Sequence, residues 1–232
     1  MLCIDLPLTD YSHALNIQNE IIKRMLTEDC PDVLVLVEHP PTVTLGVRGT
    51  TSDLLIPEHE LRRRGVTVYT VNRGGEATYH GPGQLVVYPL VNLKTRMLSA
   101  RDYVNGLEET ILRSLKCFSV RGFRKKGAAG VWIDEESKIA SIGVRIQRRV
   151  TSHGFSLNVS SSDPGDMIVS CGNPGIRMVS LNDFIPFPAS MDSVREAVKS
   201  SFEEVFRVGL DEHSLEQLRA TFAPHVDGRN RT

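Results

Sequence analysis

The chain has 232 residues, of which 41% are hydrophobic and 24% are charged, and its formal net charge at pH 7 is -1. This length is enough for one large domain, and the balanced charge provides no overall basic field for nucleic-acid binding. No apolar run approaches the ~18 residues that a membrane-spanning helix needs, and the first residues do not resemble a signal peptide. We therefore expect a cytoplasmic protein that binds neither nucleic acid nor membrane.

Four cysteines are spread along the chain without a Cys-x-x-Cys pair: Cys3, Cys30, Cys117 and Cys171. This spacing argues against a zinc site, and in a chain without a signal peptide it also argues against a disulfide framework. We expect no metal, and we expect Cys3, Cys30 and Cys117 to act as small packing residues.

The first half of the chain alternates strand-like and helix-like patterns. Asp10 precedes a helix whose apolar residues recur at helical spacing, and residues 58–64 form helical turns ended by Gly65. Strands are expected over residues 2–6, 33–37, 42–45, 66–71 and 84–91, which are rich in aliphatic and β-branched residues.

The second half continues the alternation. Ser99-x-x-Asp102 predicts a capped helix, Ser193-x-x-Glu196 predicts the start of another, and residues 214–222 predict a short last helix. Strands are expected over 131–133, 139–146 and 156–159, with a loop over 160–178 and a frayed end at 228–232. The pattern indicates an α/β or α+β fold with a mixed central sheet and flanking helices, in one domain over residues 1–232.

The most informative segment is glycine-rich and lies between two strand-like runs, so it must be an ordered connection. It reads Arg73-Gly74-Gly75-Glu76-Ala77-Thr78-Tyr79-His80-Gly81-Pro82-Gly83-Gln84. It lacks the Gly-Lys-Ser/Thr ending of a P-loop, and no helix follows it as in a dinucleotide-binding loop. Its glycines would let the backbone approach a ligand closely.

This segment resembles the hallmark of the lipoyl(octanoyl) transferase family. The resemblance extends over roughly residues 10–210, in family order, and includes Glu38-His39-Pro40, Gly130-Val131-Trp132, 138–145 and 152–158. It implies a single α/β domain like that of biotin and lipoate protein ligases. The sequence departs from many relatives at Ser170, where they have proline before the cysteine.

The resemblance implies transfer of an octanoyl group from acyl carrier protein to a lysine of lipoyl domains. These domains belong to the E2 subunits of 2-oxoacid dehydrogenases and to the glycine cleavage H protein. The donor carries its own phosphopantetheine, so no further cofactor is implied. The residues implied to bind the acyl group are Arg73, Gly74, Gly75, Glu76, Ala77, Thr78, Tyr79, His80, Ser141, Ile142, Gly143, Gly154, Phe155 and Ser156.

The family's acyl-accepting cysteine corresponds to Cys171, which lies between Ser170 and Gly172 in a segment without helical period. Only the thiolate attacks a thioester, and a free cysteine with a pKa near 8.5 is mostly protonated at neutral pH, so a base is needed. The resemblance gives this role to Lys138, at the start of an apolar strand where partial desolvation favours the neutral amine. His80 and His153 are the rival bases, because a Cys–His pair is the commoner arrangement.

Two other functions remain open. An ATP-dependent lipoate or biotin ligase would share the fold but would need no nucleophilic cysteine. A non-catalytic module could use the same slot to sense acyl chains on a carrier protein. Two short basic clusters, Arg124 to Lys126 and Arg145 to Arg149, are either solvated turns or docking points for an acidic partner.

Overall fold

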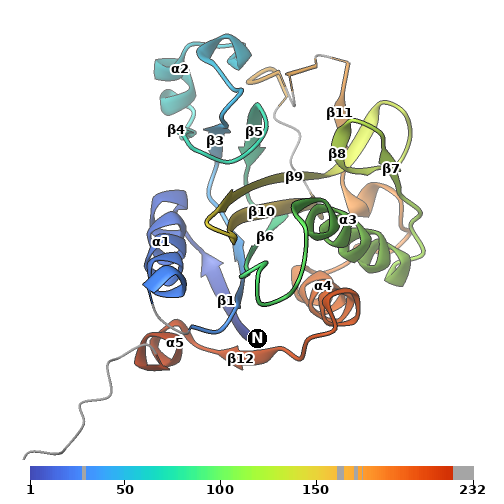
Figure 1. Cartoon of the computed structure of the whole chain (residues 1–232). Helices are drawn as coiled ribbons and strands as arrows, with labels where there is room; N and C mark the ends of the chain where they lie inside the picture. Colours follow the sequence, from blue (N-terminus) through green and yellow to red (C-terminus); the bar gives the residue numbers. More distant parts are fainter. Residues whose placement is uncertain (28–29, 161–164, 170–171, 174, 222–232) are drawn as a thin grey trace, which may run out of the picture.

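The computed structural model describes residues 1–27, 30–160, 165–169, 172–173 and 175–221 (Figure 1). A nine-stranded sheet has the order β12-β1-β2-β6-β10-β9-β8-β7, and β11 pairs with β9 off this path. Strand β1 pairs in parallel with β2 and β12. The other neighbouring pairs in this order, from β2–β6 to β8–β7, are antiparallel. The predicted mixed sheet with flanking helices is therefore confirmed.

The strands of the large sheet are β1 (Leu2–Leu8), β2 (Val33–Glu38), β6 (Gln84–Leu90), β7 (Phe123–Lys125), β8 (Ala128–Trp132), β9 (Ser137–Gln147), β10 (Val150–Asn158), β11 (Arg177–Met178) and β12 (Asp211–His213). A three-stranded sheet has the order β4-β3-β5, with β3 (Thr42–Leu45), β4 (Thr67–Thr70) and β5 (Ala77–His80). The helices are α1 (Tyr11–Thr27), α2 (Glu58–Arg63), α3 (Ala100–Cys117), α4 (Met191–Phe206) and α5 (Leu215–Thr221), with short 3₁₀ turns at Thr51–Asp53 and Leu181–Asp183.

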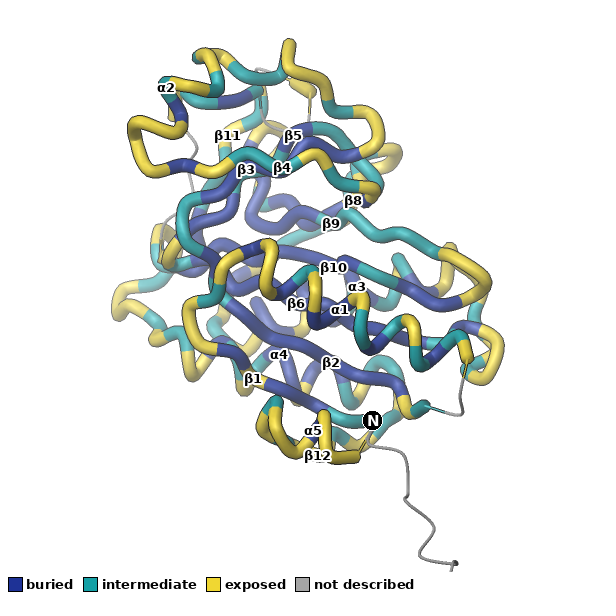
Figure 2. Tube along the Cα trace, turned by 90° about the vertical axis from the view of Figure 1, so that its left-hand side faces the viewer, coloured by how far each residue is buried: buried dark blue, intermediate teal, exposed yellow. Residues whose placement is uncertain are grey.

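Both faces of the large sheet are buried, which explains the unbroken apolar run of β2. Val33, Val35 and Val37 face a cluster that contains residues of α1, and Leu34 and Leu36 face a cluster built with α3 and α4. Successive strand residues point to opposite faces, so each face needs its own aliphatic side chains. Figure 2 shows the resulting dark band of buried strands between the helices.

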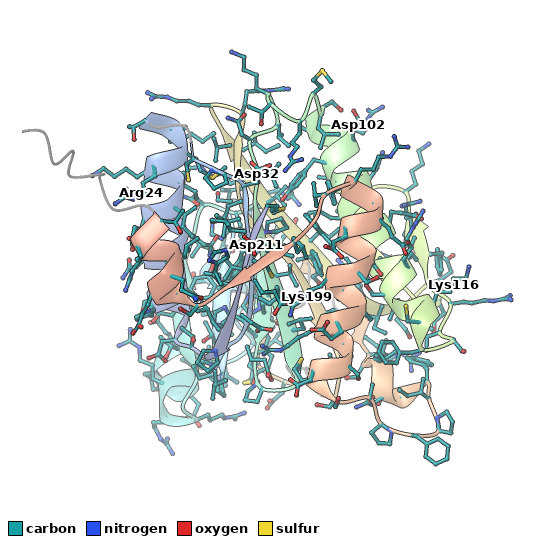
Figure 3. The ribbon with its side chains drawn as sticks, turned by 90° about the horizontal axis from the view of Figure 1, so that it is seen from below. Arg24, Asp32, Asp102, Lys116, Lys199 and Asp211 are labelled. Atoms are coloured by element: carbon teal, nitrogen blue, oxygen red, sulfur yellow. The ribbon has the colours of Figure 1, made fainter. Side chains whose placement is uncertain are left out.

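An ion-pair network ties the edge strand β12 to the sheet from below (Figure 3). Lys199 Nζ of α4 lies 2.8 Å from Glu212 Oε1 of β12 and 3.7 Å from Asp5 Oδ2 of β1. Arg195, one turn earlier, donates to Asp5 and to Glu38 Oε1. These contacts join α4 and β12, near the end of the described chain, to β1 and β2 at its start.

Most predicted elements are confirmed, but several details differ. Helix α4 begins at Met191. Its N-cap is Ser190, three residues before the predicted cap Ser193. Within the glycine-rich segment, residues 77–80 form strand β5 rather than a loop. Strand β10 begins at Val150, six residues before the predicted start, and β11 lies in the segment predicted as loop. Residues 228–232 lie outside the described part of the chain.

Across the described ranges, no helix has the length and apolar character needed to cross a bilayer. Within the same ranges, no group of three or more metal-ligating side chains is found.

Candidate functional site

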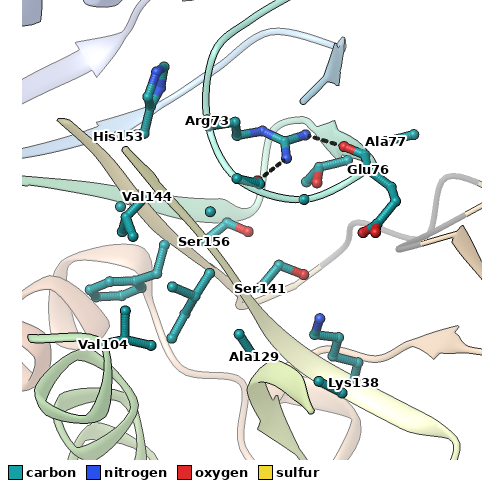
Figure 4. A pocket seen from close by; sticks show the side chains of 18 of the residues that line it. Arg73, Glu76, Ala77, Val104, Ala129, Lys138, Ser141, Val144, His153 and Ser156 are labelled. Carbon is teal, nitrogen blue, oxygen red and sulfur yellow. Dashed lines mark hydrogen bonds between the residues drawn. The ribbon is translucent and has the colours of Figure 1, made fainter. Parts of the chain in front are cut away.

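A cavity of about 420 Å³ lies between the glycine-rich segment and the strands β9 and β10 (Figure 4). Among the residues that the structure describes, its lining includes every predicted site residue except Tyr79. These residues are Arg73, Gly74, Gly75, Glu76, Ala77, Thr78, His80, Lys138, Ser141, Ile142, Gly143, Gly154, Phe155 and Ser156. Residues from two distant parts of the sequence thus surround one space.

The glycine-rich turn is held over the sheet by the buried side chain of Arg73. Its guanidinium donates to Thr44 O at 2.7 Å and to Glu76 O at 2.9 Å. Gly74 N donates to Val144 O of β9 at 3.0 Å, and a Cβ at Gly143 would lie only 2.8 Å from Gly74 O. Glycine at 143 therefore allows the turn to lie directly on the strand.

The floor of the cavity is made of small residues on one face of β9 and β10. Ser141 is directly opposite Ser156, and Gly143 is directly opposite Gly154. Opposite residues in an antiparallel pair share a face, so this arrangement leaves a shallow path across the strands. The Ser141 Oγ is buried and has no hydrogen-bond partner among the residues that the structure describes, so its donor capacity is available to a ligand.

Lys138 lies at one end of this path and is only 4% exposed. Its Nζ lies 5.2 Å from the centroid of the Trp132 ring, which also lines the cavity. Gly130 provides the space: a Cβ at that position would lie 2.7 Å from Lys138 Cε. The lysine therefore points into the cavity rather than into water, as Figure 4 shows.

Glu76 is the acidic group beside Lys138. The hydrogen bond from Arg48 Nε, at 2.7 Å, lowers the pKa of Glu76, and the positive charge of Lys138 lowers it further. A Cβ at Gly172 would lie 3.1 Å from Glu76 Cγ, so the backbone at Gly172 adjoins this carboxylate. Asn173 and Ile176 line the cavity as well.

Cys171 and Ser170 lie outside the described residues, so the predicted nucleophile has no described position. Residues that follow it in sequence do have one: Asn173 and Ile176 line the cavity, and Gly172 lies beside the lining residue Glu76. Of the other cysteines, Cys3 is buried, and burial raises the pKa of its thiol to about 12. Cys117 is exposed, so the expectation that it packs is wrong.

The two rival histidines are buried and held by hydrogen bonds. Burial lowers the pKa of His80 to about 3, with further lowering by His39 and Arg73. Burial also lowers the pKa of His153 to about 4, together with the charges of Arg73 and Arg145. His80 Nδ1 lies 2.7 Å from Gln84 Oε1, and His153 Nε2 lies 3.0 Å from Asn72 Oδ1. Both rings are therefore neutral near pH 7 and weakly basic.

Tyr79 is placed differently from its neighbours. Thr78 and His80 face the cavity, and strand alternation turns Tyr79 toward the small cluster around Val43 and Leu45. Sequence reasoning did not identify Tyr11, Arg48, Val86, Tyr88, Val104 and Trp132 as lining residues. Trp132 carried a signal, since it belongs to the Gly130-Val131-Trp132 motif, but Tyr11 is simply the first residue of a helix.

The two basic clusters have different positions relative to the cavity. Arg124 pairs with Glu108 and Glu109, Lys125 pairs with Glu135, and the next residues, Gly127 and Ala128, line the cavity. Arg148 and Arg149 form the β9–β10 turn in left-handed conformation, at the other end of β9. The first cluster therefore adjoins the cavity, and so does Arg145, which follows the lining residue Val144, whereas Arg148 and Arg149 lie at the far end of β9.

Comparisons with known proteins agree with this geometry. Residues 10–203 match the family model described as the lipoyl protein ligase A/B catalytic domain. The chain is 39% identical over 199 residues to the octanoyltransferase of Desulforamulus reducens (85% of this chain, 87% of the relative) and 40% identical over 207 residues to that of Syntrophotalea carbinolica (89% and 94%).

A solved structure has the same fold. The bipartite lipoate protein ligase of Thermoplasma acidophilum, described with its E2 lipoyl domain, is similar with a TM-score of 0.75 at 15% identity, over 95% of this chain and 90% of that chain. With the family match over most of its length, this chain belongs to the lipoyl protein ligase A/B catalytic-domain family.

Proposed function

We propose that this protein is a single-domain cytoplasmic octanoyltransferase. It moves an octanoyl group from octanoyl-acyl carrier protein to the ε-amine of a lysine on lipoyl domains, through a thioester on Cys171. The names of the curated relatives, at 39% and 40% identity over most of the chain, support octanoyl transfer. The partners and the intermediate are our inference.

The observation that carries the proposal is the burial of Lys138 at the end of the cavity that lies near Gly172. Lys138 is 4% exposed and shares this end with Glu76, which adjoins Gly172. Cys171 directly precedes Gly172 in the sequence. Such a pairing of a nucleophile with a base is the requirement for activating a thiol.

The proposed cycle conserves protons. Lys138, acting as the base, takes the proton of Cys171, and the thiolate attacks the carbonyl carbon of the donor thioester. The bond to the phosphopantetheine sulfur breaks, and Lys138 returns the proton to that leaving thiol. The amine of the target lysine then attacks the Cys171 thioester, loses a proton to Lys138, and the Cys171 thiolate leaves. The donor thioester supplies the activation, so no nucleotide or further cofactor is needed.

Ser141 supports the tetrahedral intermediates in this proposal. At Ser141, strand β9 pairs with Gly130 of β8 on one side and with Ser156 of β10 on the other. The unpartnered Oγ of Ser141 is therefore the available donor on the floor for the negative charge that develops on the carbonyl oxygen.

The partners follow from the same chemistry. The donor is an acyl group on the phosphopantetheine of acyl carrier protein, and the acceptors are lipoyl domains of E2 subunits and the glycine cleavage H protein. A structural neighbour, described with its E2 lipoyl domain, supports the acceptor class. The basic cluster near the cavity, Arg124 to Lys126, is where we expect an acidic carrier protein to dock.

The main alternative is an ATP-dependent ligase, because the solved neighbour with this fold is a lipoate protein ligase. The deciding experiment is transfer from octanoyl-acyl carrier protein to a purified lipoyl domain without nucleotide. We expect octanoylated lipoyl domain to form at an unchanged rate when ATP is omitted. Product that forms only from free octanoate and ATP would establish a ligase, and binding of the carrier protein without product would establish a sensing module.

A further inference from the structure

This inference rests on the proposed function and concerns the length of the transferred chain. Four residues on neighbouring strands form one row across the large sheet. Gly130 of β8 is opposite Ser141, Ser141 is opposite Ser156, and Ser156 is opposite Val86 of β6. The row begins beside Lys138, whose Nζ would lie 3.3 Å from a Cβ at Gly130.

The row has a length that suits an acyl chain of about eight carbons. Three strand spacings of about 4.8 Å give about 14 Å from Gly130 to Val86. An extended octanoyl chain measures about 9 Å from its carbonyl carbon to its terminal methyl. One van der Waals contact of about 4 Å between that methyl and the end of the row accounts for most of the difference.

Val86 is the first bulky aliphatic residue in this row after the two serines, and it is flanked by rigid rings. Tyr88, two residues further on the same face of β6, is fixed by His39 Nε2, which lies 2.8 Å from its hydroxyl. Tyr11 of α1 stacks on His80 with ring centroids 5.9 Å apart. Val86, Tyr88, Tyr11 and His80 all line the cavity and are at most 6% exposed.

Beyond Val86, the row continues into the hydrophobic core. Its next neighbour in the row is Val37 of β2, which is 0% exposed and belongs to the core cluster that contains residues of α1. We propose that Val86 is the end wall of the acyl slot, and that it sets the preferred chain length by contact with the terminal methyl. Tyr11 and Tyr88 keep this wall from moving.

The test compares hexanoyl-, octanoyl- and decanoyl-acyl carrier protein as donors, with kcat/KM for transfer to a lipoyl domain as the readout. Val86→Ala removes two methyl groups from the wall, so decanoyl transfer should rise about tenfold relative to octanoyl transfer. Val86→Leu adds a methylene, so octanoyl transfer should fall about tenfold relative to hexanoyl transfer.

Val87→Ala is the matched control. Val87 is the adjacent, equally buried residue of β6, but it faces the cluster under α3 and α4. It should lower stability as Val86→Ala does and leave both ratios unchanged. If Val86→Ala does not fold, the ratio for Val86→Leu decides. Unchanged ratios in both Val86 variants, with normal octanoyl transfer by the wild type, would overturn the inference.

Calorimetric binding of free octanoate and decanoate separates this inference from the proposed function. If the wall is correct, Val86→Ala gains affinity for decanoate relative to octanoate, whether or not the protein transfers an acyl group. A wild type that binds octanoate but transfers nothing from the carrier protein would refute the proposed function alone. Equal preference in the wild type and in Val86→Ala would refute the wall.

Discussion

The buried position of Lys138 depends on a residue without a side chain. Gly130 has φ of +123°, a region that other residues rarely adopt, and a Cβ there would collide with Ala140 O and with Lys138 Cε. Gly130→Ala should therefore displace Lys138, lower stability by about 1–3 kcal/mol and reduce acyl transfer severely. Urea unfolding and single-turnover transfer measure the two effects.

Gly65→Ala is the control for backbone strain alone. Gly65 also has a positive φ, +75°, but a Cβ there would meet nothing within 4 Å. It should cost about 1 kcal/mol of stability and leave transfer unchanged. If Gly130→Ala behaves in the same way, the packing of Gly130 against Lys138 has no role in the reaction.

Substitutions of Lys138 and of the two histidines can show which of these residues is the base. Lys138→Ala should slow acylation by about 10²- to 10⁴-fold at neutral pH, and raising the pH should recover part of the loss as Cys171 ionises on its own. The double variant Lys138→Ala/Cys171→Ala should lose little more activity than Cys171→Ala alone, because the two groups act as a unit. The assay is single-turnover acylation across pH, with His80→Asn and His153→Asn for comparison. Near-normal rates in Lys138→Ala, with collapse in a histidine variant, would assign the base to that histidine.

The sequence indicated the motif residues of the site but not the side chains that form the rest of the cavity wall. Residues 73–80, Lys138 and the 141–143 and 154–156 segments came from the motif resemblance, and all of these residues except Tyr79 line the cavity. Tyr11 and Val86 have no local signal, because they reach the cavity only when α1 and β6 pack against the same face. Tertiary packing of this kind is not encoded in any short stretch of sequence.

At the scale of elements, the start of α4 shows how local signals compete. Both Ser190 and Ser193 are capping residues by type, and the sequence favoured Ser193 because Glu196 follows it at capping-box spacing. In the structure the side chain of Ser190 accepts from Ser193 N at 3.2 Å, while Ser193 Oγ donates to Ser190 O. The earlier start adds a turn to the helix and places Val194 and Val198 in the core.

The N-cap at Ser190 predicts how two serine substitutions change the stability of the protein. Ser190→Ala removes the acceptor for an amide of the first helical turn and should cost about 1 kcal/mol. Ser193→Ala removes only a side-chain donor inside the helix and should cost a few tenths of that amount. Urea unfolding of both variants distinguishes the two cap assignments, and a larger loss in Ser193→Ala would favour the predicted start.

Elements with strong periodicity were predicted well, and short edge strands were not. The face of α3 and the buried run of β2 follow directly from apolar spacing. Strands β7, β11 and β12 have two or three residues each and are set by pairing with neighbours, such as Met178 opposite Lys138. Residues 150–155 gave no strand signal because His153 and Gly154 interrupt the β-prone pattern.

At the scale of the whole molecule, the buried histidines predict a dependence of stability on pH. The folded pKa of His80 is about 3 and that of His153 about 4, whereas both are near 6.5 when unfolded. Below pH 6.5 the unfolded chain binds protons that the folded chain does not, so the free energy of unfolding falls with decreasing pH. Each histidine contributes up to about 1.4 kcal/mol per pH unit in this range.

Urea unfolding at pH 7, 6 and 5 measures this effect above the range where most carboxylates titrate. His153→Asn should make the slope shallower, and asparagine tolerates the φ of +55° found there. His13→Asn is the control, since His13 lies on the exposed face of α1. Stability that stays constant from pH 7 to pH 5 would contradict the buried, neutral state of these rings.

The central claim is that an acyl group passes through Cys171, and intact-mass spectrometry tests it most directly. The protein is incubated with octanoyl-acyl carrier protein without acceptor, beside Cys171→Ala and a variant in which Cys3, Cys30 and Cys117 are replaced. The account predicts that the wild type and the triple variant each gain one octanoyl group, which hydroxylamine removes, and that Cys171→Ala gains none. An equal gain in Cys171→Ala, or full transfer to a lipoyl domain by that variant, would contradict the account.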